Sequence, residues 1–184
     1  MGVADGTYRL SPQAGRLLVK TARTGLGAKA GHDLTIEVTR WQGEVLVNAA
    51  SPAASSVSLT AEVDSFEVRE GTGGVKPLTD GDRREIAVTL RDKILRAREH
   101  PTITFTSTTV AGTPEALRIE GELAIAGATQ PVTVQARLTG ERAVGSASVV
   151  QSRWGIKPYS AFFGALKLRD EVVVEFDVGL TLAR

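Results

Sequence analysis

The sequence predicts an all-β fold, a barrel of about eight antiparallel strands with one α-helix. Apolar and polar residues alternate with period two over most of the 184 residues, which is the pattern of half-buried strands. Only Thr79–Arg98 has apolar residues at helical spacing. Strands and helices do not alternate, so a parallel sheet is excluded. Long strands favour a barrel because closure removes unpaired edges, and a two-sheet sandwich remains the alternative.

The composition limits the kinds of partner. Lys and Arg number 22 and Asp and Glu 21, so the net charge of +1 favours neither nucleic acid nor an anionic membrane. The chain has no cysteine, which excludes a disulfide framework, a thiolate zinc site and a cysteine nucleophile. A chain of this length buries most of its surface around one core, and we expect residues 1–184 to form a single domain.

The N-terminal residues, MGVADGTYRLSP, have neither the basic start nor the apolar run of a secretory signal. No apolar stretch approaches the roughly 18 residues that a membrane-spanning helix needs. On these grounds we expect a soluble cytoplasmic protein without an integral membrane segment. The sequence leaves the oligomeric state open, a homodimer included.

The N-terminal half is expected to form short strands joined by irregular segments. Trp41-Gln42 is expected to be the turn of a hairpin. The segment Arg69–Pro77 is rich in glycine but lacks the spacing of a phosphate-binding loop, so we interpret it as a connection. The strands expected in this half are Thr7–Leu10, Arg16–Ala22, Leu34–Arg40, Gly43–Asn48 and Val57–Phe66.

The one expected helix, Thr79–Arg98, has Ile86, Leu90 and Ile94 at i, i+4 and i+8. Thr79, Asp80 or Asp82 can cap its start. Because the apolar stripe is narrow, we expect the helix to lie against the outside of the sheet or across an end of it. After it the alternation becomes most regular, and the expected strands begin near Ile103 and cover Leu117–Ile125, Val132–Leu138, Ala143–Ser152 and Val172–Leu182.

The connection Arg153–Asp170 is unusually apolar. It contains Trp154, Tyr159, Phe162 and Phe163, which are four of the nine aromatic residues in the chain. Connections normally run over the surface and are polar. Two interpretations are open: the rings fold back as a plug that closes one end of the core, or they form the lip of an apolar cavity and contact a ligand.

Three passages, HPTITFTS at 100–107, GELAIAGATQPVTVQARL at 121–138 and SRWGIKPYSAFFGALKLRDEVVVEF at 152–176, are similar to passages of the YceI family of polyisoprenoid-binding, lipocalin-like proteins. The resemblance extends from Thr7 to Leu182. It implies an extended eight-stranded antiparallel lipocalin-like barrel with a capping helix and an apolar tunnel that holds a long isoprenoid chain. Many family members carry a secretory signal, which we do not expect here. The His-containing opening strand of the family has its nearest equivalent in Gly31-His32-Asp33.

Pattern and resemblance together predict a protein that stores, carries or shields an apolar lipid, either a polyprenyl chain or an isoprenoid quinone, with no other cofactor. At about −0.3 kcal/mol per heavy atom, a ligand of about forty carbons would gain roughly −12 kcal/mol from apolar area and shape alone. His32, Arg153 and Lys157 are the polar residues expected at the cavity mouth. The residues expected to contact the ligand are Phe105, Trp154, Tyr159, Phe162, Phe163, Val174 and Phe176.

Two other functions stay open. An enzyme acting on a prenylated substrate would use His32, but His32 and His100, the two histidines, have no spacing that brings them together. We therefore expect no catalytic residue and no metal site. An interaction module would fill the barrel with its own side chains and dock a protein through the aromatic connection. Charges of both signs interleave on the helix, so nucleic acid is not an expected partner.

Overall fold

The structure is a computed structural model that describes residues 3–161 and 165–183. In the N-terminal half the strands are β1 (Gly6–Leu10), β2 (Gly15–Lys20), β3 (Arg23–Thr24), β4 (Asp33–Val38), β5 (Trp41–Val47), β6 (Ser56–Glu62) and β7 (Phe66–Thr72). In the C-terminal half they are β8 (Thr102–Thr113), β9 (Ala116–Ile125), β10 (Ala128–Thr139), β11 (Arg142–Val150), β12 (Ser160–Ala161), β13 (Leu166–Leu168), β14 (Glu171–Gly179) and β15 (Thr181–Leu182). The helical segments are α1 (Asp80–Thr89), the π-helical turn η4 (Leu90–Ile94), and the 3₁₀ turns η1 (Ala28–Ala30), η2 (Pro52–Ala54), η3 (Val63–Ser65) and η5 (Gln151–Trp154).

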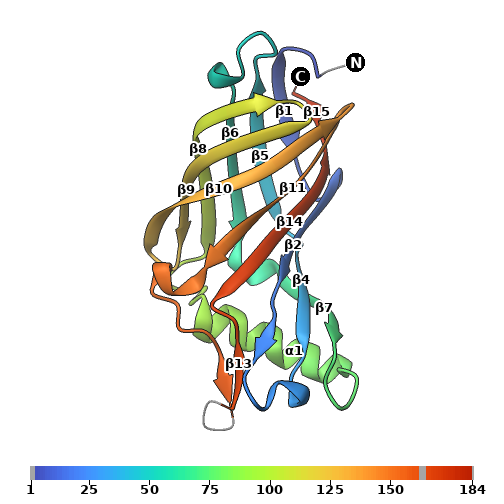
Figure 1. Ribbon diagram of the computed structural model, residues 1–184, viewed down its shortest axis with the longest axis vertical. Helices are drawn as coiled ribbons and strands as arrows, with labels where there is room; N and C mark the ends of the chain where they lie inside the picture. The colour runs from blue at the N-terminus through green and yellow to red at the C-terminus, as the bar shows by residue number, and fades with distance from the viewer. Residues whose placement is uncertain (1–2, 162–164, 184) are drawn as a thin grey trace.

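Twelve strands form one curled antiparallel sheet in the order β15-β1-β5-β6-β8-β9-β10-β11-β14-β2-β4-β7 (Figure 1). A second, three-stranded sheet has the order β12-β13-β3 and lies at the lower end of the molecule in Figure 1. The all-β prediction with one α-helix is confirmed over the described residues, and the fold is lipocalin-like.

The expected count of eight strands is wrong, because short bends divide several long strands. For example, β1 pairs with β15 and β5, while β2, which follows β1 after four residues, pairs with β14 and β4. Leu10 and Leu17 are both buried although they lie an odd number of positions apart, so the period-two pattern changes phase across this bend. At the break between β14 and β15 the alternation does continue, with Val178 and Leu180 both buried, so a pattern of period two misses that interruption.

The expected hairpin around Trp41-Gln42 is also wrong. Strand β4 pairs with β2 and β7, and β5 pairs with β1 and β6, so β4 and β5 are not neighbours. The chain bends between Val38 and Trp41, and Trp41 begins β5 with its side chain 6% exposed. A large aromatic residue suits a half-buried strand better than a turn.

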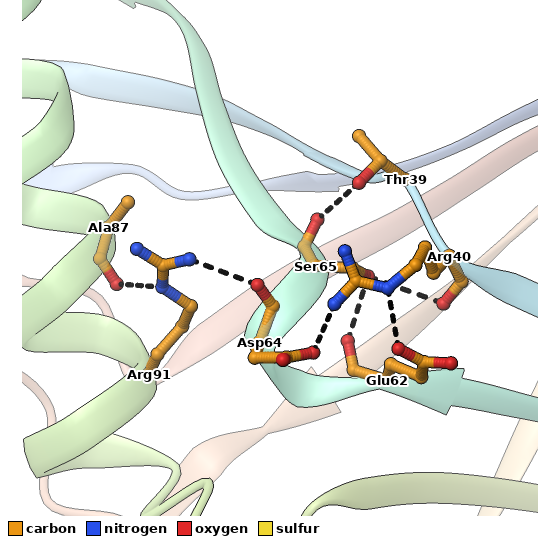
Figure 2. Close-up of polar contacts among 7 residues, drawn as sticks. All are labelled: Thr39, Arg40, Glu62, Asp64, Ser65, Ala87 and Arg91. Carbon is orange, nitrogen blue, oxygen red and sulfur yellow. Dashed lines mark hydrogen bonds and ion pairs between the residues drawn. The ribbon is translucent and has the colours of Figure 1, made fainter.

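A polar cluster holds the bends of β4–β5 and β6–β7 together (Figure 2). The Arg40 guanidinium donates to the carboxylates of Glu62, at 2.5 Å, and of Asp64. Ser65, 1% exposed, donates its hydroxyl to the backbone carbonyl of Glu62 at 2.8 Å. From the helical segment, Arg91 donates to the backbone carbonyl of Asp64 at 2.9 Å. The helical segment is thereby attached to the point where the sheet bends.

Helix α1 lies across the lower part of the curled sheet in Figure 1, as expected of a capping helix. Its N-cap is Thr79, which forms a capping box with Asp82. The helical segment ends earlier than the expected Arg98. Leu95 is the C-cap of the π-helical turn, and Arg96, with a φ of 53°, lies outside the helical region. Within residues 3–161 and 165–183, no helix is long and apolar enough to cross a membrane.

Candidate ligand-binding cavity

The inner face of the curled sheet surrounds a cavity of about 400 Å³, within the usual range for small-molecule sites. Leu90 and Ile94 of the helical segment line it at one end, and Asn48 and Ser55 of the β5–β6 connection line it at the other. Between these ends the wall is built from inward-facing Val, Leu, Ile, Phe and Ala side chains. None of the described residues in the wall is Asp, Glu, Lys, Arg or His. The site is thus a long apolar space without a charged group.

Two phenyl rings of the wall lie next to glycines on neighbouring strands. A Cβ atom on Gly121 would lie 2.5 Å from Phe105 Cε2, and one on Gly145 would lie 2.5 Å from Phe176 Cζ. Gly145 is the direct cross-strand partner of Phe176. The rings therefore occupy space that a side chain on the adjacent strand would otherwise fill, and this packing leaves the interior open.

Three residues expected to contact a ligand, Phe105, Val174 and Phe176, lie in the cavity wall. Their contact with a ligand stays a prediction. Phe162 and Phe163, which were expected to contact it as well, lie outside the described residues.

Trp154 lies outside the cavity wall and packs in the core with 3% of its surface exposed. Its indole Nε1–H donates to the backbone carbonyl of Leu123 at 2.7 Å, and the guanidinium of Arg153 lies 5.7 Å from the ring centroid. These contacts attach η5 to β9, as the plug interpretation expects for this ring. Tyr159, by contrast, is 46% exposed.

The three polar residues expected at a cavity mouth do not line the cavity, and their place at its mouth stays a prediction. His32, Arg153 and Lys157 are absent from its described wall. His32 Nε2 lies 2.7 Å from the backbone carbonyl of Lys76, a contact between two connections. The structure therefore gives His32 a structural partner outside the described cavity wall.

Trp41 is the largest of the wall residues that were not among the expected ligand contacts. It lines the wall together with Val45 and Val47, while Gln42 and Glu44 between them are exposed. This alternation is visible in the sequence and would have assigned Trp41 to the inner face. Its indole Nε1 is buried and has no hydrogen-bond partner among the described residues, which is uncommon for a buried donor.

The titratable groups with shifted pKa values lie outside the described cavity wall. The pKa of Arg40 is raised, mainly because the Arg40 side chain donates a hydrogen bond to Glu62. Hydrogen bonds from Thr79 lower the pKa of Asp82. The pKa of Glu115 is also lowered, mainly by a hydrogen bond from the backbone amide of Glu115. Among the described residues no group of three or more His, Asp or Glu is placed to hold a metal ion. Acid–base catalysis commonly uses groups with shifted pKa values in a cleft, and the described cavity wall contains no such group.

A curled all-β sheet, a capping helix and an uncharged apolar interior define a lipocalin-like protein. Residues 8–180 match the YceI-like domain, and the chain belongs to the YceI family. The resemblance seen in the sequence is thereby confirmed.

Curated relatives include protein YceI of Escherichia coli, 31% identical over 101 residues, and a UPF0312 protein of Pseudomonas aeruginosa, 29% identical over the same length. Each alignment covers 55% of this chain and 47% of the relative, so the chain matches about half the length of these proteins.

Solved structures show the same fold. A polyisoprenoid binding domain from Saccharophagus degradans has a TM-score of 0.62 at 11% identity, with 98% of this chain and 100% of that chain covered. BcnA of Burkholderia cenocepacia has a TM-score of 0.59 at 19% identity, with 88% and 94% covered. The YceI protein of Campylobacter jejuni has a TM-score of 0.58 at 16% identity, with 81% and 84% covered.

Proposed function

We propose that this protein binds a long apolar isoprenoid, a polyprenyl chain or an isoprenoid quinone, and stores or carries it. The observation that supports the proposal is the uncharged apolar cavity of about 400 Å³. A hydrocarbon chain forms no hydrogen bonds, so its affinity comes from the apolar area removed from water. The likeness to a polyisoprenoid binding domain supports the same class of ligand.

In this proposal the twelve-stranded sheet closes around the ligand as a barrel. The two ends of the sheet order are formed by β15 and β7, which directly continue β14 and β6 along the chain. Strand β14 pairs with β11 and β2, and β15, which follows it after one residue, pairs with β1. A closed wall would shield a bound chain from water along its length.

The test compares two tryptophan substitutions on the same strand. Val174 faces the cavity, whereas its neighbour Val173 does not line it and pairs with Lys20 and Ser148. We expect Val174→Trp to fill the interior and lower the uptake of a fluorescent polyprenyl probe at least about tenfold, and Val173→Trp to leave uptake near that of the parent protein. Circular dichroism checks that both variants are folded.

Native mass spectrometry of the purified parent, followed by lipid extraction, would identify any isoprenoid that accompanies it. Equal probe uptake by both variants would place binding outside the cavity and contradict the proposal. A parent protein that takes up no probe after extraction would instead favour an interaction module with a barrel filled by its own side chains.

A further inference from the structure

Three connections far apart in the sequence meet at the lower end of the molecule in Figure 1. We call residues 24–32, 71–78, 157–161 and 165–168 the basic tip. Lys167 is the cross-strand partner of Thr24, and the amide of Gly27 donates to the carbonyl of Ala165 at 2.9 Å. The contact between His32 and the carbonyl of Lys76 joins the third connection to the first. These bonds make the three connections one surface.

The basic tip concentrates positive charge. It carries Lys29, Lys76, Lys157 and Lys167, four of the six lysines in the chain, and all four are exposed. Its residues include no Asp and no Glu, although the net charge of the whole chain is only +1. The small net charge therefore conceals a local excess of positive charge at the basic tip.

The acidic residues that flank the basic tip do not cancel this charge. Asp33 pairs with Arg23 at 3.7 Å, Asp80 with Arg83 at 3.3 Å, and Asp170 accepts from the amide of Ser152 at 2.8 Å. Glu70, at the end of β7, is the remaining flanking acid and is exposed. Of these four flanking acids, only the Glu70 side chain has no ion pair or hydrogen bond among the described residues, against four exposed lysines.

The basic tip also exposes large apolar side chains. Leu26 is fully exposed, Val75 is 80% exposed and Tyr159 is 46% exposed. They are three of the six large apolar residues that the described part of the chain exposes. Exposed apolar side chains gain little in water, and apolar residues mixed with lysines are typical of surfaces that bind the interface of an anionic bilayer.

The basic tip adjoins one end of the cavity. Thr21 and Ile156 line the cavity, and the tip connections begin at residues 24 and 157. Docking of the tip on a bilayer would therefore hold this end of the apolar space against the lipid.

We propose that the basic tip docks on an anionic lipid surface. Leu26, Val75 and Tyr159 enter the interface, and the four lysines contact the head groups. The proposal goes beyond ligand binding and does not depend on which molecule occupies the cavity. At the usual contribution of a surface lysine, four of them favour an anionic over a neutral bilayer by about 100-fold or more.

Vesicle flotation tests this proposal with equal parts of phosphatidylglycerol and phosphatidylcholine against phosphatidylcholine alone. We expect the protein to float with the anionic vesicles and to be released by high salt, because salt screens surface charges. Failure to bind the anionic vesicles, or equal binding to both kinds, would overturn the proposal. An acidic protein partner would then be the more suitable occupant.

Paired variants locate the contact. The charge pair is Lys29→Gln with Lys76→Gln, for which we expect about 30-fold weaker binding to the anionic vesicles. Its matched control removes two exposed arginines on strands β1 and β10, Arg9→Gln with Arg137→Gln, and should have a several-fold effect at most.

The apolar pair is Leu26→Asp with Val75→Asp, and its control is Leu46→Asp with Leu182→Asp, two exposed leucines on β5 and β15. We expect Leu26→Asp with Val75→Asp to abolish flotation and the control pair to leave it unchanged. All four double variants should take up the polyprenyl probe in solution like the parent protein, so that a failed docking surface is distinguished from a failed cavity. A tip variant that still floats like its control would contradict docking through the tip.

Discussion

Thr79 and Asp82 fix where the helix begins. Thr79 Oγ1 accepts a hydrogen bond from the Asp82 amide at 3.1 Å, and the Asp82 carboxylate accepts from the Thr79 amide at 2.8 Å and from its hydroxyl at 2.7 Å. The hydrogen bonds from Thr79 are the main cause that lowers the pKa of Asp82. Because the pKa is lower in the folded than in the unfolded protein, this carboxylate stabilises the fold above the unfolded value of about 3.9. The contribution is lost as the pH falls through the folded value.

We predict that Thr79→Ala lowers the free energy of unfolding by about 1 kcal/mol at pH 7, the usual effect of removing an N-cap. Asp82→Asn keeps a side-chain oxygen acceptor but cannot titrate, so its stability should fall less steeply below about pH 4 than that of the parent. Urea unfolding at a series of pH values measures both effects. An Asp82→Asn variant with the acid dependence of the parent would contradict the assignment.

At the same scale, alternation predicts which face a residue occupies but not what it contacts. Phe105, Val174 and Phe176 were assigned to the inner face from period two alone, and they lie in the cavity wall. The partner of Trp154 is the carbonyl of Leu123, 31 residues earlier in the sequence. No local pattern carries that contact, because it depends on how η5 approaches β9 in the folded protein.

At the scale of elements, the strands could be predicted, but not every break in them nor which strands pair. The segments predicted around Leu117–Ile125 and Val172–Leu182 correspond to β9 and to β14 with β15. The bend between β4 and β5 is held by Arg40, whose guanidinium donates to Glu62 at the end of the distant β6 and whose backbone carbonyl accepts from the Ser65 hydroxyl in the β6–β7 bend. Sequence alternation contains no signal for such contacts, so the bend was interpreted as a turn between paired strands.

Strand β11 is rich in small residues, and its role in shaping the cavity can be tested. A Cβ atom on Gly145 would lie 2.3 Å from the carbonyl oxygen of Gln135 and 2.5 Å from Phe176 Cζ. We predict that Gly145→Ala costs about 1–3 kcal/mol, as overpacking does, and moves Phe176 into the cavity. Uptake of the polyprenyl probe should fall as well as the melting temperature.

Gly179→Ala on β14 is the matched control, because its nearest contact would be an ordinary 3.4 Å to the carbonyl oxygen of Ala14. It should change melting temperature and uptake little. If Gly145→Ala lowered stability but left uptake unchanged, Phe176 would not limit the interior space.

At the scale of the whole molecule, composition conceals the distribution of charge. The net charge of +1 predicts no preference for an anionic surface. Yet four of the six lysines belong to the segments 24–32, 71–78, 157–161 and 165–168, which meet only in the folded protein. The basic tip therefore could not be inferred from the sequence without the topology that joins these connections.

The apolar cavity also predicts how the stability of the whole molecule responds to its ligand. Side chains around an empty space lack packing partners on one side, and a bound chain supplies them. A ligand that binds only the folded state stabilises it by about 2.7 kcal/mol when its free concentration is 100 times Kd. For a protein of this size that corresponds to a rise in melting temperature of roughly 5–10 °C.

We therefore predict that lipid extraction lowers the melting temperature by about that amount and that adding back a polyprenyl alcohol restores it. Differential scanning calorimetry of extracted and reloaded protein measures the change. Val174→Trp fills the interior with protein atoms, so its melting temperature should respond little to the lipid, whereas Val173→Trp should respond like the parent. An equal response from both variants would mean that the lipid stabilises the protein from outside the cavity, because only the Val174 substitution blocks the interior.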